Sequence, residues 1–178
     1  MISKKTPPQD IILKLKTNKT PIVKMNQTHS SNIQIITTKP TKNLTTIPNV
    51  DGLITHLPNL ALCVKFADCM PITISHPTTN YLCVLHAGRK GTLALILQKA
   101  LQQLKKLTAS EIDFHIWFGP HISEPCFEIN RTPSKHFNLI KENISQLKNE
   151  LSLTKNNLSI TSECTKCSSM YYSYRGDN

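Results

Sequence analysis

The sequence predicts an α+β protein: a layered sandwich of mixed β-sheet with flanking helices. Three observations support this fold class. Several short apolar segments have strand periodicity, one longer segment has helical periodicity, and the two kinds alternate without strict βαβ regularity. A chain of 178 residues with 39% hydrophobic residues can build one substantial core. We therefore expect residues 1–178 to form a single domain.

The expected strands are short apolar runs bounded by turn residues. Residues 10–16, "DIILKLK", read as an edge strand or a short arm. The nearly continuous apolar run "LALCVKFA" at 60–67 indicates a buried strand. Further strands are expected within residues 32–38, 49–59, 71–76, 81–88, 110–119 and 156–162.

Two segments have helical character. The clearest helix is expected from Gly91 to Leu107, where apolar residues recur at three- and four-residue spacing. Residues 132–153 contain one or two helices, with Thr132 as a plausible cap and Pro133 in the first turn. Residues 163–178 read as an irregular tail.

The charge and composition restrict the classes of partner. The net charge of +10 invites a nucleic-acid interpretation, but the lysines are scattered and no aromatic residues interleave with them. Phosphate-bearing small molecules are the more natural partners. The first residues lack the apolar core of a signal peptide, and no run reaches the ~18 apolar residues that span a bilayer. We expect a cytoplasmic protein with no membrane partner, in which the six cysteines are thiols.

Cys69 and His86 are the first candidates for chemistry. Cys69 follows Asp68 where one apolar run ends and the next begins, and His86 ends a strand just before a turn into the long helix. Asp68 has two readings: it caps the strand end, or it assists proton transfer or orients a ligand histidine. Arg89 and Lys90 oppose the dipole of the helix that they begin, which suggests either an acidic ligand, phosphate above all, or a solvated basic turn.

His29 reads, from its local sequence alone, as a solvent-exposed histidine. If His29, Cys69 and His86 converge, two imidazoles and one thiolate form a donor set that suits Zn²⁺. Without a metal, Cys69 and His86 form a nucleophile–base pair instead. Sequence spacing does not establish that these residues converge.

The remaining cysteines give weaker signals. Cys164 and Cys167 form a C-x-x-C pair, but no second such pair accompanies them, so we do not expect a structural zinc site there. Cys126 follows a strand in "GPHISEPCFE", and Cys63 and Cys83 are expected to pack as small apolar residues.

Several segments together resemble the bacterial laccase-domain family, whose members were named multicopper polyphenol oxidases and are now described as purine nucleoside phosphorylases. The combination of "ADC-P" followed by "HAG" is specific, and the resemblance runs from about residue 24 to the C-terminus. The matching segments, in order, are "QTHS" (27–30), "DGLIT" (51–55), "FADCMPI" (66–72), "HAGRKG" (86–91), "GPHISEPCFE" (119–128) and "CTKCSSMYYSYRGD" (164–177).

The resemblance implies a metal site and a reaction. The family's His–Cys–His zinc site falls on His29, Cys69 and His86, with Zn²⁺ expected rather than copper. Gln27 of "QTHS" and Arg175 of "YRGD" join Arg89 and Lys90 as expected substrate or phosphate ligands. The expected catalytic residues are Cys69, His86 and Asp68. The implied fold is related to toxin cysteine deamidases. The implied chemistry is phosphorolysis of adenosine and inosine, cleavage of S-methyl-5′-thioadenosine, and adenosine deamination.

The chain also departs from the family pattern. The usual turn reads "HAGWRG", whereas Arg89 and Lys90 stand here in place of the tryptophan and arginine. Both ends look shortened, so we expect a laccase-like domain with contracted termini, and a homo-oligomer is left open.

Three other functions compete with the phosphorylase. A multicopper oxidase needs ligands for four coppers, and none of the seven histidines stands in an H-x-H pair, so the sequence argues against that mechanism. A hydrolase or deamidase would use Cys69 and His86 to form a covalent thioester. A catalytically weakened metal-binding domain would retain metal without nucleoside turnover.

Overall fold

The computed structural model describes residues 20–129, 135–152 and 156–177. The expected strand or arm at 10–16 and the expected cap at Thr132 and Pro133 lie outside these residues. The strands are β1 (Ile22–Asn26), β2 (Ile33–Ile36), β3 (Leu44–Pro48), β4 (Gly52–Thr55), β5 (Ala61–Cys63), β6 (Met70–His76), β7 (Tyr81–Ala87), β8 (His115–Phe118) and β9 (Asn157–Ile160). The helices are η1 (Pro77–Thr79), α2 (Arg89–Leu93), α3 (Ile96–Thr108), η2 (Glu124–Cys126) and α4 (Leu139–Glu150).

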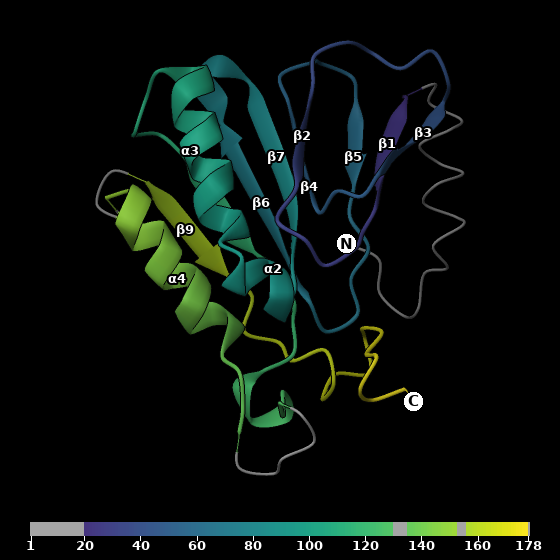
Figure 1. Cartoon of the computed structure of the whole chain (residues 1–178), viewed down its shortest axis with the longest axis vertical. Helices are drawn as coiled ribbons and strands as arrows, with labels where there is room; N and C mark the ends of the chain where they lie inside the picture. The colour runs from purple at the N-terminus through teal and green to yellow at the C-terminus, as the bar shows by residue number, and fades with distance from the viewer. Residues whose placement is uncertain (1–19, 130–134, 153–155, 178) are drawn as a thin grey trace.

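The strands form two sheets. The larger sheet is mixed, with the order β2-β4-β7-β6-β8-β9, and the smaller sheet is parallel, with the order β3-β1-β5. Strands β4, β7, β6 and β8 are antiparallel neighbours, whereas β2 and β9 join the two edges in parallel. Figure 1 shows the larger sheet between the helices on one side and the smaller sheet on the other.

Alternating side chains on the central strands supply both faces of the larger sheet. Ile54 of β4 and its partner Cys83 of β7 belong to the main core with α3 and α4. The next pair, Leu53 and Val84, belongs to a second core with Val23 of the smaller sheet. The large sheet is thus buried on both sides, and the expected layered α+β fold is confirmed.

The strands expected within the described residues are present, but the prediction was incomplete in two ways. Strands β1 and β3 were not predicted, and β5 covers only three half-buried residues of the eight-residue run from which a buried strand was expected. The pairing with β1 ends at Cys63. Further on, Asp68 has a φ of 82°, which is incompatible with a continuing strand.

The single helix expected from Gly91 to Leu107 is instead two helices. Leu95 adopts a left-handed backbone with φ of 63° and ends the run between α2 and α3. The apolar spacing crosses this break, but Leu93 and Leu95 are 56% and 44% exposed, whereas the apolar residues from Ile96 to Leu104 are buried. The short helix α2 is tied to α4 by the Gln146 side chain, which donates to the Thr92 carbonyl.

The helix expected within 132–153 begins later than the proposed cap. The Asn138 side chain accepts a hydrogen bond from the Lys141 backbone N–H at 2.8 Å and so caps α4. The tail after β9 has no regular helix or strand among its described residues, as expected. Within the described part of the chain, no helix is long and apolar enough to span a bilayer.

The break at Leu95 gives a stability test. Leu93→Gly removes a helical residue from α2 and should lower the free energy of unfolding by about 1 kcal/mol. Leu95→Gly should change it by less than about 0.5 kcal/mol, because relief of the left-handed strain offsets the added freedom of the unfolded chain. Urea titration of both variants measures the difference. Equal losses would contradict the left-handed break.

Candidate metal and active site

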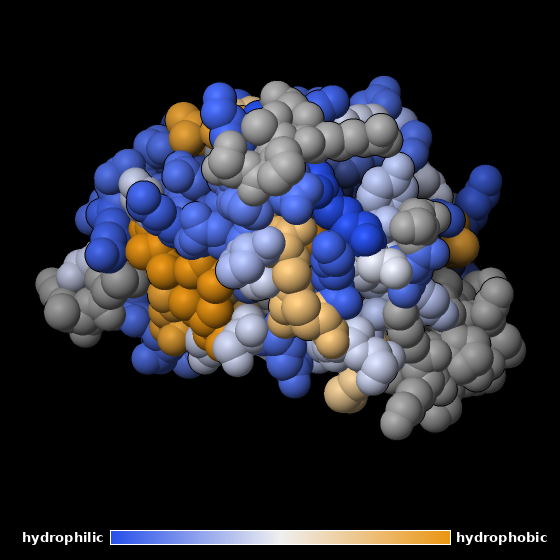
Figure 2. All heavy atoms as spheres, turned by 90° about the horizontal axis from the view of Figure 1, so that it is seen from below, coloured by the Kyte–Doolittle hydropathy of each residue, from blue (hydrophilic) through white to orange (hydrophobic). Residues whose placement is uncertain are grey.

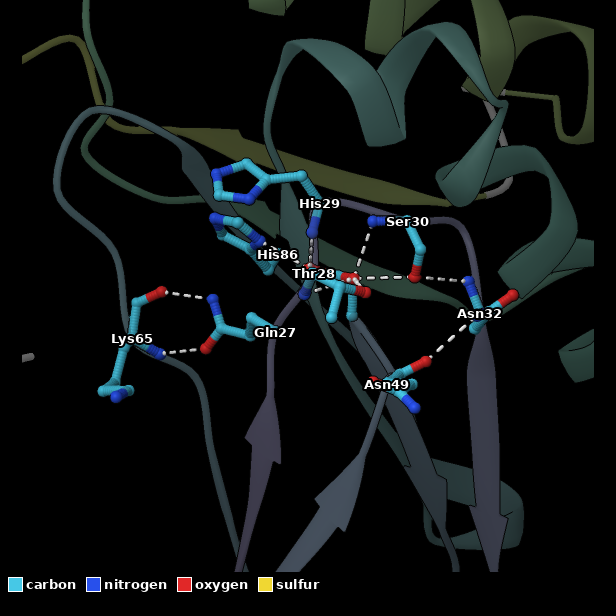
Figure 3. Close-up of polar contacts among 9 residues, drawn as sticks. Gln27, Thr28, His29, Ser30, Asn32, Asn49, Lys65 and His86 are labelled. Atoms are coloured by element: carbon cyan, nitrogen blue, oxygen red, sulfur yellow. Dashed lines mark hydrogen bonds and ion pairs between the residues drawn. The ribbon is translucent and has the colours of Figure 1, made fainter.

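The candidate site lies at one end of the sandwich, where four strand ends meet. The loop with His29 follows β1, Asp51 directly precedes β4, Cys69 directly precedes β6, and His86 is the penultimate residue of β7. The pairing of Pro71 with His86 across β6 and β7 fixes the last two segments relative to one another. Side chains that are 57 residues apart in sequence, such as His29 and His86, therefore face one another (Figure 3).

The Asp51 carboxylate is fully buried and organises this end of the molecule. Its oxygens accept the backbone N–H groups of three consecutive residues, Thr28, His29 and Ser30, at 3.1, 3.0 and 2.7 Å. The Ser30 hydroxyl donates to the same carboxylate at 2.7 Å. Consecutive N–H groups that include a left-handed residue form an anion-binding nest, and His29 has a φ of 61°. The carboxylate thus holds the loop in the conformation that presents the His29 ring.

Asp51 also fixes the protonation of His86. The His86 Nδ1 lies 2.8 Å from a carboxylate oxygen of Asp51, which can only accept, so Nδ1 carries the proton. Burial raises the pKa of Asp51, but hydrogen bonds from His86, Ser30 and Thr28 outweigh it and hold the pKa below its ordinary value. Burial lowers the pKa of His86 more than the carboxylate raises it. A neutral ring with Nδ1–H bound leaves the lone pair of Nε2 available to a ligand.

His29, Cys69 and His86 converge in the structure. One ligand atom from each of the three lies within 4.8 Å of the others, and the two imidazole rings meet edge to face with centroids 4.9 Å apart. A Cβ at Gly88 would lie 2.7 Å from the Cys69 sulfur and 3.2 Å from the His29 ring. Only glycine leaves Cys69 and His29 this space. Two imidazoles with one thiol are a suitable set for a zinc-like ion.

The Cys69 thiol is not activated by its surroundings alone. Burial, with smaller contributions from the nearby carboxylates of Asp68 and Asp51, raises its pKa to about 11. A nucleophilic cysteine needs the opposite shift, because the thiolate is the reactive form. A bound cation at this place would supply the missing stabilisation of the thiolate.

Asp68 anchors the C-terminal segment rather than pointing to the three donors. Its carboxylate accepts the hydroxyls of Thr165 and Ser173 at 2.8 and 2.6 Å and the backbone N–H of Arg175 at 2.8 Å. The Asp68 carbonyl accepts the backbone N–H of Ile122 at 2.9 Å. The residue is buried in a left-handed conformation, so the turn that carries Cys69 is clamped from both sides.

Arg89 and Lys90 begin α2 beside the three donors. Lys90 is exposed, whereas the Arg89 Nε is buried without a hydrogen-bond partner among the described residues. The Arg89 guanidinium lies 5.9 Å from the centre of the Phe137 ring. A buried donor without a partner is costly, which favours an acceptor supplied by a ligand.

Gln27 and Arg175, the other expected phosphate ligands, have protein partners instead. The Gln27 amide bonds both the carbonyl and the N–H of Lys65 at 2.8 Å (Figure 3) and so ties the loop after β1 to the chain before Asp68. The Arg175 guanidinium lies 5.1 Å from the centre of the Phe127 ring. The partners of the two side chains are thus Lys65 and Phe127, not the three donors.

The residue that sequence reasoning missed is Asp51. The segment "NVDG" reads as turn chemistry, which hides a buried carboxylate. The available signal was an acidic residue immediately before an apolar strand in one of the segments shared with the laccase-domain family. Its role depends on N–H groups more than 20 residues away, which no local pattern reveals.

Asp51→Asn should weaken metal binding by 10- to 100-fold, roughly the effect of losing a partner that orients a metal ligand. The amide offers one acceptor where the carboxylate offered two, so the loop with His29 and the His86 ring lose their shared anchor. Competition with a chromophoric zinc chelator measures the affinity. Asp113→Asn, at a half-exposed carboxylate bonded to Thr78, is the matched control and should leave the affinity unchanged. Equal affinities for both variants would contradict the role of Asp51.

Comparison with known proteins places the chain in a family. The family model described as multi-copper polyphenol oxidoreductase laccase matches residues 9–150. The chain is similar to the structure of YlmD from Geobacillus stearothermophilus, with a TM-score of 0.81, 22% identity and coverage of 95% of this chain and 76% of that one. The Bacillus licheniformis hypothetical protein YfiH gives a TM-score of 0.80 at 24% identity, with the same coverage. These two likenesses establish the shared fold.

Curated relatives are named as nucleoside enzymes. A protein of Campylobacter jejuni named purine nucleoside phosphorylase is 37% identical over 109 residues, which are 60% of this chain and 45% of that protein. A protein named adenosine deaminase RL5, from an unknown prokaryotic organism, is 27% identical over 128 residues, covering 66% of this chain and 49% of that one. The matches span less than half of these relatives. Because the family model extends over most of the chain, the protein belongs to the multi-copper polyphenol oxidoreductase laccase family.

Proposed function

We propose that the protein is a zinc-dependent purine nucleoside phosphorylase that acts on adenosine or inosine and on S-methyl-5′-thioadenosine. The observation that carries the proposal is the convergence of His29, Cys69 and His86 beside the cationic start of α2. The names of the curated relatives support the same class of substrate.

His29, Cys69 and His86 would hold the metal. The donor set suits Zn²⁺, and Gly88 leaves space for the Cys69 and His29 side chains. When bound, the ion would supply a Lewis acid for a substrate oxygen. Asp51 keeps the His86 tautomer and the His29 loop in the binding arrangement. Asp68 acts as a positioning residue, because its hydrogen bonds fix the turn that carries Cys69.

Arg89 and Lys90 would hold the phosphate. The unpaired Nε of Arg89 offers a directed donor, and the exposed ammonium of Lys90 adds positive charge beside it. Gln27 would contribute indirectly, because its side chain fixes the backbone of Lys65. Arg175 is proposed as a further ligand for substrate or phosphate, since its backbone N–H is bound by Asp68, the residue next to Cys69.

The reaction displaces the purine with phosphate. A phosphate oxygen forms a bond to C1′ of the ribose while the C1′–N9 bond breaks, and the purine leaves with that electron pair and takes up one proton. The products are the free base and ribose 1-phosphate. Cations that hold phosphate next to C1′ would lower the barrier chiefly by positioning the reactants.

The family's older description as multicopper oxidases does not suit this chain. Such an oxidase needs ligands for four coppers. In residues 20–129, 135–152 and 156–177, potential ligands gather in one His₂Cys group and one group of three cysteines. Two such groups are too few for a mononuclear copper and a trinuclear cluster.

A cysteine hydrolase or deamidase is the second candidate, because Cys69, His86 and Asp51 are arranged as a nucleophile, a base and an orienting carboxylate. The raised pKa of the Cys69 thiol opposes this candidate. A deaminase that uses a metal-bound water is compatible with the same donors and with the name of one relative.

The test is chromatographic. The purified, metal-assayed protein is incubated with inosine or adenosine, with and without phosphate, beside Cys69→Ser and Cys63→Ser variants. We expect hypoxanthine or adenine together with ribose 1-phosphate, only when phosphate is present. Cys69→Ser should lower the rate by at least about 100-fold, whereas Cys63→Ser, a thiol of β5, should not change it.

Three other results would contradict phosphorolysis. Inosine formed from adenosine without phosphate would establish deamination. A thioester on Cys69 detected by mass spectrometry would establish the hydrolase. Stoichiometric zinc without turnover of any nucleoside, S-methyl-5′-thioadenosine included, would leave a catalytically weakened metal-binding domain.

A further inference from the structure

Three cysteines outside the candidate active site also converge. Cys126 ends η2, and Cys164 and Cys167 lie in the C-terminal segment after β9. The three sulfur atoms lie within 4.8 Å of one another, and those of Cys126 and Cys167 are 3.5 Å apart although the residues are 41 positions apart in sequence. The C-x-x-C pair from which no zinc site was expected thus acquires a third thiol from another part of the chain.

The surroundings of the cluster match those of metal-bound thiolates. The Ser123 backbone N–H donates to the Cys164 sulfur at 3.3 Å, an interaction that orients a thiolate and offsets its charge. The Ser168 N–H donates to the Cys164 carbonyl at 3.0 Å and closes the turn between the two cysteines of the pair. Both Cys126 and Cys164 are half-buried and Cys167 is exposed, so an ion could enter from solvent.

The C-terminal segment is held by individual contacts rather than by regular secondary structure. Its described residues form no helix or strand, and its exposed residues include Met170, Tyr172 and Tyr174. Its contacts with the rest of the protein include the hydrogen bonds of Thr165 and Ser173 to Asp68 and the cysteine cluster itself. Figure 1 shows the segment crossing below the sheets near η2. Figure 2 shows this end of the molecule, where one large hydrophobic patch and smaller ones lie among mostly hydrophilic residues. An irregular segment on such a surface needs cross-links to stay ordered.

We propose that Cys126, Cys164 and Cys167 bind a second, structural thiophilic metal ion, Zn²⁺ or a similar soft divalent cation, that fixes the C-terminal segment. Three thiolates are a ligand set that suits Zn²⁺ and other thiophilic metal ions. Water or a further protein donor completes the fourth position. The proposal concerns a site distinct from His29, Cys69 and His86 and does not depend on nucleoside turnover.

The cluster and the candidate active site are connected by two routes that meet at Asp68. Thr165, between the two cysteines of the pair, is fully buried and donates to Asp68, which directly precedes Cys69. On the other side, Ser123, which bonds Cys164, follows Ile122, which bonds the Asp68 carbonyl. An ion on the three thiols therefore also holds the partners of the turn that carries Cys69.

Metal content measures the site directly. The full chain, purified without chelators and under reducing conditions, should contain two equivalents of zinc. Cys126→Ser and Cys167→Ser should each retain one equivalent, Cys69→Ser should retain one, and Cys63→Ser, the matched thiol control, should retain both. In Co²⁺-loaded protein, the near-ultraviolet thiolate-to-metal absorption should fall mainly in the Cys126→Ser variant, because that site contributes three thiolates rather than one.

Trypsin reports on the structural role. Lys166, between Cys164 and Cys167, is exposed but would lie within the metal-bound turn. Cleavage after Lys166 should be roughly tenfold faster in Cys126→Ser than in Cys63→Ser, because local opening controls cleavage of an ordered segment. Adding a chelator to the wild type should give the same acceleration, which keeps the test valid where a variant folds poorly.

Two results would overturn the proposal. One is a single zinc equivalent in the wild type that is lost in Cys69→Ser but unaffected in Cys126→Ser. The other is a Cys126–Cys167 disulfide, detected as a loss of two hydrogens in the intact mass, in protein that holds no second equivalent of metal.

Discussion

The buried carboxylate of Asp51 is the constraint on which the site depends. A fully buried carboxylate is costly unless its oxygens are paired. Here they accept three consecutive backbone N–H groups, two hydroxyls and an imidazole N–H. These bonds join the loop after β1, the start of β4 and the end of β7. They also fix the tautomer of His86 and the left-handed conformation of His29. The two histidines are therefore arranged by the protein before any ligand arrives.

Cys69 is held by a second, separate anchor. Asp68 bonds the C-terminal segment through its side chain and Ile122 through its carbonyl, and its left-handed conformation directs the chain into β6. The site is thus assembled by two buried aspartates that are not themselves among the three donors. The cysteine cluster at Cys126, Cys164 and Cys167 extends this support to the end of the described chain.

Sequence patterns predicted the strands β4, β6, β7 and β8, because short apolar runs between turn residues leave few other structures. They also placed Cys69 and His86 at strand ends. They failed where long-range contacts decide: the apolar spacing of 91–107 continues across Leu95 although its backbone breaks the helix. Asp51 looked like a turn residue, and Cys126 looked unrelated to the C-x-x-C pair, because in both cases the partners lie far along the chain. The convergence of His29 with Cys69 was suggested by family resemblance rather than by spacing.

The central claim is that His29, Cys69 and His86 bind one metal ion together. X-ray absorption spectroscopy of zinc-loaded Cys126→Ser protein tests it most directly, because this variant removes the competing thiolate cluster. The account predicts one sulfur neighbour at about 2.3 Å and two imidazole nitrogens at about 2.0–2.1 Å from the zinc. Absence of bound zinc, or a zinc shell without sulfur, would contradict it.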